Sequence, residues 1–230
     1  MKNYPSLHFF AFIFCLVVFL STSACNKNPP EPTVEDLLAK TSLTVAEQER
    51  VATSLFQEMS EADEDNLDLF ERNYHTVLEK CPDTEQAHIS AWRLTNLYRL
   101  AYEEPQHEKI IAVLEPFLER YTESTVVSME KYPENILAFS PLARLHLSYS
   151  ELGRYDKISA HYEKVTAAGQ NLGPLDCFDF AEALDHLDRD EKAVKWYREF
   201  LSKSAEGPAL PILREAAEGR IKEIGTSLKK

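Results

Sequence analysis

The side chains able to do chemistry are spread along the chain without a recognisable catalytic or metal-binding pattern. None of the seven histidines belongs to an H-E-x-x-H pair, and no cysteine and histidine set has zinc-ligand spacing. The sequence also lacks the G-x-S-x-G nucleophile motif and a glycine-rich phosphate loop. We therefore expect no cofactor, no bound metal and no enzymatic activity. An enzyme on a helical scaffold stays as an alternative, because the members of a catalytic triad can be far apart in sequence.

Two acidic clusters are the nearest approach to a metal site. The cluster Asp185–Asp190 (DHLDRD) falls on an expected turn between helices, where solvated acidic side chains are common. The cluster Glu61–Asp68 (EADEDNLD) has calcium-loop character, but that loop requires Gly where Asp68 stands and Glu where Tyr74 stands. We expect neither cluster to be a metal site.

Cys25 is the one cysteine in a chemically suggestive position. Lys2 gives the start of the chain a positive charge, and the unbroken apolar run Phe9–Leu20 follows. This run is shorter than the roughly 20 residues of a membrane span, and small residues come directly after it. A charged start, a short apolar core and a small-residue exit are typical of a cleaved secretory signal, which we place at residues 1–24.

The residues around the expected cleavage point resemble the lipobox of a bacterial lipoprotein signal. Ser23, Ala24 and Cys25 fit that pattern, whereas Thr22 stands where leucine is usual. The resemblance implies a lipid such as palmitate on Cys25 and a membrane anchor. Two alternatives are open: ordinary signal peptidase could cut after Ala24 without lipidation, or the segment could stay as an uncleaved anchor.

Residues 25–33 read as a tether. Three prolines lie within four positions at Pro29–Pro32, and they favour an extended, non-helical chain. In bacterial lipoproteins an aspartate directly after the lipidated cysteine marks inner-membrane retention, and here that residue is Asn26. The resemblance therefore implies the bacterial envelope, at the periplasmic face of the outer membrane.

The net charge of the chain limits the classes of partner that it can bind. The formal net charge is −13, and removal of residues 1–24 with Lys2 makes it −13 − (+1) = −14. A negative surface repels phosphate groups, so we expect no nucleic-acid partner and no attraction to anionic lipid. The negative charge either keeps the protein soluble or attracts a basic partner.

The rest of the sequence has a repeated helical pattern. Glycine is scarce, with 6 in 230 residues, and apolar residues recur at spacings of three and four from Val34 onward, which favours amphipathic helices. Four segments repeat one pattern, with starts 40, 48 and 35 residues apart. They are Phe70-Tyr74-Val77, Ile110-Leu114-Phe117, Ile158-Tyr162-Val165 and Ala193-Tyr197-Phe200.

The third segment resembles the tetratricopeptide (TPR) repeat, a 34-residue helix–turn–helix unit. Tyr149, Gly153 and Tyr155 keep the spacing of that family around the turn. His146 and Ile158 replace two small residues of the family pattern. The apolar residues of the two helices are Leu142, Leu145 and Tyr149, then Ile158, Tyr162 and Val165.

This resemblance covers roughly residues 45–205 and implies an all-α, TPR-like α-α superhelix. We expect a solenoid of about four helix pairs within a domain at residues 34–230, closed by a capping helix at 208–228. The expected apolar residues of the cap are Ile212, Ala216, Ile221 and Ile224.

Two details complete the expected fold. Cys81 and Cys177 lie in different repeats, too far apart for a disulfide, and we expect buried free thiols. The stretch Thr122–Lys131 reads either as an extended helix or as a loop.

With no catalytic pattern, the expected function is protein binding by a membrane-tethered scaffold or adaptor of an envelope assembly complex. The family binds partners on the concave face formed by the first helices of its repeats. The alternative within the envelope is a periplasmic helper that binds peptidoglycan or a cell-wall or secretion enzyme.

The candidate binding residues follow from the register of the second unit. If Ala91, Leu94 and Tyr98 point inward, a neighbouring stripe of the same helix carries the candidates, since a helix advances 100° per residue. The candidates are Trp92, Arg93, Asn96 and Arg99, with Arg144 on the corresponding face of the third unit. The fourth unit offers acidic residues instead, namely Asp179, Glu182 and Asp185. The alternative is that Trp92 packs against an adjoining helix and the arginines are solvated.

Overall fold

The computed structural model describes residues 31–121, 140–204 and 211–227, and these residues form ten α-helices without a strand. The helices are α2 (Val34–Leu38), α3 (Val45–Glu61), α4 (Leu67–Lys80), α5 (Glu85–Leu100), α6 (His107–Arg120), α9 (Pro141–Glu151), α10 (Tyr155–Ala167), α11 (Pro174–His186), α12 (Asp190–Lys203) and α13 (Pro211–Ser227). The all-α prediction is confirmed for these parts of the chain. The signal segment 1–24, Cys25 and the stretch Thr122–Lys131 lie outside them.

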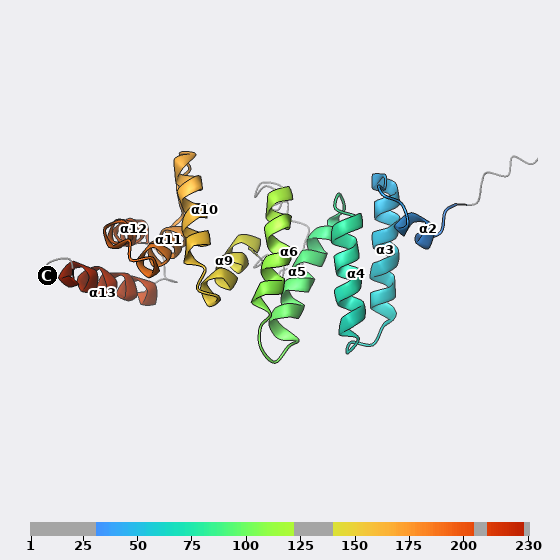
Figure 1. Cartoon of the computed structure of the whole chain (residues 1–230), viewed down its shortest axis with the longest axis horizontal. Coiled ribbons are helices and arrows are strands. Elements are labelled where there is room, and N and C mark those ends of the chain that lie inside the picture. Colours follow the sequence, from blue (N-terminus) through green and yellow to red (C-terminus); the bar gives the residue numbers. More distant parts are fainter. Residues whose placement is uncertain (1–30, 122–139, 205–210, 228–230) are drawn as a thin grey trace, which may run out of the picture.

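The helices pack in the order in which they occur along the chain. Each contacts mainly its neighbours in sequence, including α6 with α9 and α12 with α13. Figure 1 shows the result, an elongated array that runs from α2 to α13. Most of this pairing follows from short connections, because a short loop returns the next helix against the previous one. The pair α6 and α9 differs, since residues 121–140 separate the two helices.

Local signals in the sequence fix several helix starts. Thr33 and Thr44 form capping boxes, in which the threonine hydroxyl accepts from a backbone N–H and a carboxylate three residues on accepts from the threonine. Ser140 caps α9 in the same position, directly before a proline at the first helical residue. The turn after α9 uses Gly153 with φ of +68°, a left-handed conformation that favours glycine.

The apolar triads of the sequence face the core as expected. Ile110, Leu114 and Phe117 are buried in one cluster that extends to α13. Val77 belongs instead to a second cluster formed around α2 and α3. Three residues of the four triads are partly exposed, namely Phe70, Tyr74 and Val165.

The capping helix packs on the expected face only in its second half, where Ile221 is partly buried and Ile224 is buried. Ile212 is 81% exposed and Ala216 is also exposed, so this part of the prediction was wrong. Ala217 and Ile224 are the buried residues of α13, with Leu213 partly buried beside them. In the first two turns of α13 the residues that pack on the core are thus Leu213 and Ala217, each one position after the expected Ile212 and Ala216.

The two cysteines of the described chain are free and buried, as predicted. Cys81 lies in the cluster around α2 and α3, and Cys177 lies in the larger cluster. Burial raises the pKa of each thiol to about 11. Both are therefore packing residues in the protonated form.

Candidate partner-binding face

Of the predicted residues of α5, Arg93 and Arg99 lie away from its buried side, whereas Trp92 and Asn96 are half-buried. Ala91, Leu94 and Tyr98 are at most 1% exposed, whereas Arg93 and Arg99 are exposed. Trp92 is half-buried and packs against the core cluster, and the Arg93 guanidinium lies 4.7 Å from the centre of its ring. A cation over an indole face is a favourable arrangement, so Trp92 both supports the core and holds Arg93.

Arg144 joins α9 to α5. Its Nη1 donates to Asn96 Oδ1 at 2.7 Å and to Thr95 Oγ1 at 3.1 Å. Burial, with a smaller contribution from the positive charge of Arg99, lowers the pKa of Arg144 to about 10. Arg144 is therefore a charged residue that positions Asn96, and it brings α9 onto the same face as the predicted stripe of α5.

Arg93 and Arg99 differ from most arginines of this acidic chain. Within the described residues, neither forms an ion pair with a carboxylate. Six other arginines do form such pairs, at distances of 2.5 to 3.4 Å. They are Arg50, Arg72, Arg120, Arg154, Arg189 and Arg220. The α5 stripe thus presents positive charge that the surrounding described surface does not neutralise.

A largely apolar cavity adjoins Arg93. It has a volume of about 460 Å³ and lies between α4 and α5, and its polar lining residues are Arg93, Asn96 and Glu64. Its apolar walls include Phe70, Tyr74 and Leu100, and Leu100 is 68% exposed. A depression with apolar walls and a few polar groups is the usual composition of a recognition site.

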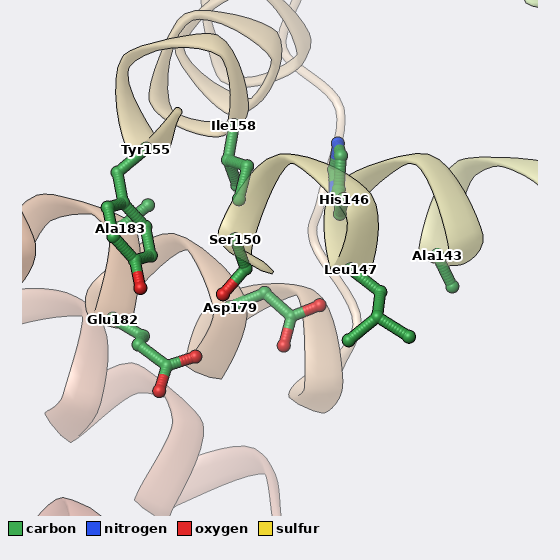
Figure 2. Close-up of a pocket in the computed structure, with 9 residues that line it drawn as sticks. All are labelled: Ala143, His146, Leu147, Ser150, Tyr155, Ile158, Asp179, Glu182 and Ala183. Atoms are coloured by element: carbon green, nitrogen blue, oxygen red, sulfur yellow. The ribbon is translucent and has the colours of Figure 1, made fainter. Parts of the chain in front are cut away.

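A second cavity, of about 240 Å³, lies between α9 and α11 and is closed on one side by α10. Figure 2 shows Leu147 and Ser150 from α9 on the same side as Asp179 and Glu182 from α11. The aromatic residue of the lining is Tyr155, which stacks on His186 with ring centres 3.9 Å apart.

The carboxylates of this second cavity carry uncompensated charge. Burial raises the pKa of Asp179 to about 6, with smaller contributions from the negative charges of Glu182 and Asp176. No lysine or arginine of the described chain forms an ion pair with Asp179 or Glu182. One turn further on, Asp185 is bound by Arg220 of α13 through two hydrogen bonds of 2.7 Å. The three acidic residues predicted for the fourth unit therefore divide into two unpaired ones and a paired one.

The α9 helix reaches the lining of both cavities. Arg144 points to α5, and Leu147, three residues later and 48% exposed, lines the acidic cavity. The face formed by α5, α9 and α11 is hereafter called the binding face. Along it, charge changes from positive at Arg93 and Arg99 to negative at Asp179 and Glu182, with apolar surface between them.

The histidine nearest to these carboxylates is a packing residue. His146 is 5% exposed, and its ring centre lies 5.1 Å from that of His161 and 5.0 Å from that of Tyr162. Burial, with a smaller contribution from His161, lowers the pKa of His146 to about 3. His146 also lines the second cavity, and in Figure 2 its ring points away from Asp179. His146 thus fills the α9–α10 interface at the position where the TPR pattern has a small residue.

Two searches of the described residues bear on other functions. They contain no group of three or more His, Cys, Asp or Glu side chains placed to hold a metal ion. Every helix among them is too short or too polar to span a membrane. Comparison of the chain with models of known protein families, with curated proteins and with solved structures found no match.

Proposed function

We propose that this protein is a non-enzymatic, lipid-anchored scaffold of the bacterial envelope that binds a protein partner on the binding face. In this proposal the body is a TPR-like superhelix of about four helix pairs, capped by α13. The sequential packing of α3 to α13 supports that architecture. The observation that carries the function is a pair of exposed arginines on α5 that have no ion pair within the described chain, of which Arg93 lines an apolar cavity.

The partner is a segment of polypeptide with acidic and apolar side chains. An apolar side chain occupies the cavity between α4 and α5, and a carboxylate pairs with Arg99 or Arg93. A guanidinium binds a carboxylate through two parallel hydrogen bonds, which gives direction as well as affinity. Asn96, held by Arg144, offers its amide to the backbone of the segment.

The anchor is a lipid on Cys25, followed by the proline-containing tether 25–33. An extended tether of this length spans roughly 28 Å, at about 3.1 Å per residue. That reach holds the helical array off the bilayer while keeping the binding face close to envelope proteins.

The test compares Arg99→Ala with the parent protein in crosslinking and affinity capture from detergent-solubilised envelope. Arg198→Ala is the matched control, because Arg198 on α12 is also exposed and makes no ion pair within the described chain. We expect Arg99→Ala to weaken binding of the captured partner roughly thirtyfold, equivalent to about 2 kcal/mol. Arg198→Ala should bind like the parent.

Two results contradict the proposal. Unchanged affinity of Arg99→Ala, at unchanged helicity, excludes this face as the site. Retention on purified peptidoglycan without a captured protein favours the alternative of a peptidoglycan-binding helper.

A further inference from the structure

We infer that the cavity between α9 and α11 is a subsite for one cationic side chain, lysine or arginine, of the bound partner segment. The inference rests on the proposed function, because it concerns the same binding face. It adds the chemistry of the partner at the end of the face away from Arg93 and Arg99.

The size of the cavity argues for a single side chain. Its volume of about 240 Å³ lies below the roughly 300–1,000 Å³ that is usual for small-molecule sites. The cavity opens on a face whose neighbouring surface at Leu147 is exposed and apolar. A residue of an extended segment can therefore enter it while the rest of the segment lies on α9.

The walls of the cavity suit the shape of a long cationic residue. Lysine and arginine have an apolar stem and a charged end, and they bury the stem along apolar surface. Leu147, Ile158 and Ala183 supply apolar wall, and Tyr155 supplies an aromatic ring. The ring of Tyr155 is held by its stack on His186. Cations are attracted to such a ring, which adds to the fit.

The charge of the cavity identifies the group that completes it. Asp179 and Glu182 both line it and have no cationic partner in the described chain, whereas the nearby Asp185 is fully paired with Arg220. Partial burial of a carboxylate without a counter-charge has a cost in free energy, because the charge loses water. An opposite charge that approaches the carboxylate offsets this cost of desolvation. The apolar stem and the two acceptors together favour lysine or arginine over a neutral side chain.

Two carboxylates and the Ser150 hydroxyl do not suit calcium, which takes six to eight oxygen ligands. The negative charge also excludes an acidic side chain from this cavity. The segment bound on the whole face is accordingly acidic over α5 and basic over α11.

The test uses N-acetyl-arginine amide as a probe and N-acetyl-citrulline amide as its neutral counterpart of the same shape. Each is titrated into the purified full-length protein in detergent, and the methyl resonances of Leu147 are followed by NMR. We expect saturable shifts with the arginine probe and at least about tenfold weaker binding with the citrulline probe, equivalent to 1.4 kcal/mol. Equal binding of the two probes overturns the inference, because it shows a cavity that selects shape alone.

Variants locate the binding. Glu182→Gln and Asp179→Asn should each weaken the arginine probe about tenfold, while Glu218→Gln on the exposed surface of α13 should leave it unchanged. Loss of binding in Glu218→Gln to the same extent overturns the inference, because it indicates a nonspecific charge effect. Thermal unfolding of the variants confirms that they fold, and removal of an unpaired carboxylate is not expected to destabilise the protein.

The outcome is separable from that of the proposed function. If the probe binds in the cavity but Arg99→Ala leaves partner affinity unchanged, the subsite stands and the proposed role of α5 fails. If Arg99→Ala weakens the partner but the arginine probe does not bind, the proposed function stands and the subsite fails.

Discussion

Replacement of Asp179 by asparagine should stabilise the protein at neutral pH. The side chain keeps its size and polarity in this change, and it loses only its charge. Burial, with the negative charges of Glu182 and Asp176, raises the pKa of Asp179 from 3.8 to about 6. The folded state therefore favours the protonated carboxyl, and ionisation at pH 7 opposes folding.

The magnitude follows from the pKa. A rise from 3.8 to about 6 corresponds to about 3 kcal/mol, at about 1.4 kcal/mol for each tenfold change in proton affinity. Partial exposure of the side chain screens this charge, so we expect about 1–2 kcal/mol. In a chain of this length that gain raises Tm by roughly 2–8 °C.

The stability gain of Asp179→Asn should depend on pH. Below pH 3.8 the Asp179 carboxyl is protonated in both the folded and the unfolded state, so it does not oppose folding. As the pH rises through about 6, the carboxyl ionises in the folded state as well, and the protein loses stability. The other titratable groups near Asp179 are Glu182, Asp176, His146 and Tyr162, whose hydroxyl donates to Asp176 Oδ1 at 3.4 Å. The advantage of Asp179→Asn should therefore be full at pH 7 and disappear at pH 3.5.

The assay is urea unfolding followed by circular dichroism at both pH values, with Glu218→Gln as the control for loss of a surface charge. A gain of the same size at pH 3.5 and pH 7 would refute the reasoning, because it would not depend on ionisation. No gain at pH 7 would show that Asp179 is better solvated than its burial indicates. A confirmed gain means that the protein keeps a carboxylate at the expense of stability, as binding sites often do.

Three further changes test the anchor and the packing. Cys25→Ser should move the protein from the membrane pellet to the soluble periplasm, and unchanged fractionation with an intact Met1 terminus would contradict the lipoprotein interpretation. Leu114→Ala should cost about 2–5 kcal/mol in urea unfolding, because this leucine is fully buried, and a loss below about 1 kcal/mol would contradict the packing of α6. Stability should fall with acidification from pH 6.5 towards about 3, because the unfolded chain protonates His146 and the folded one does not. His146→Gln should flatten that acid limb, and an unchanged limb would assign it to other groups.

Helix periodicity was sufficient to predict the elements and most of the core. In α6 the apolar residues form one broad side of the helix, and Ile110, Leu114 and Phe117 are buried there together with Ile111 and Val113. In α13 adjacent apolar pairs such as Ile212 and Leu213 leave two possible faces. The neighbouring helix α12 decides between them, and the periodicity of α13 alone does not.

The candidate site was predictable in part for the same reason. The exposure of Arg93 and Arg99 follows from the buried side of α5, within a single helix. The hydrogen bond from Arg144 to Asn96 joins residues 48 positions apart, so it depends on how two helices meet. The ion pair of Asp185 with Arg220 likewise depends on how α11 and α13 meet. For that reason the sequence does not show that Asp185 is paired while Asp179, on the same helix, is not.

The distribution of unpaired charge on the binding face bears on how a partner is oriented. Arg93 and Arg99 lie at α5, Asp179 and Glu182 lie at α11, and α9 stands between the two sets, so they do not neutralise each other. In the proposed complex, a segment with acidic residues at one end and a basic residue at the other gains both interactions in only one direction. The reversed segment places like charges together at both ends, and such contacts are unfavourable by several kcal/mol when they are desolvated. The separation of charge across α9 thus selects the direction of the partner as well as its composition, while the apolar surface at Leu147 contributes affinity in either direction.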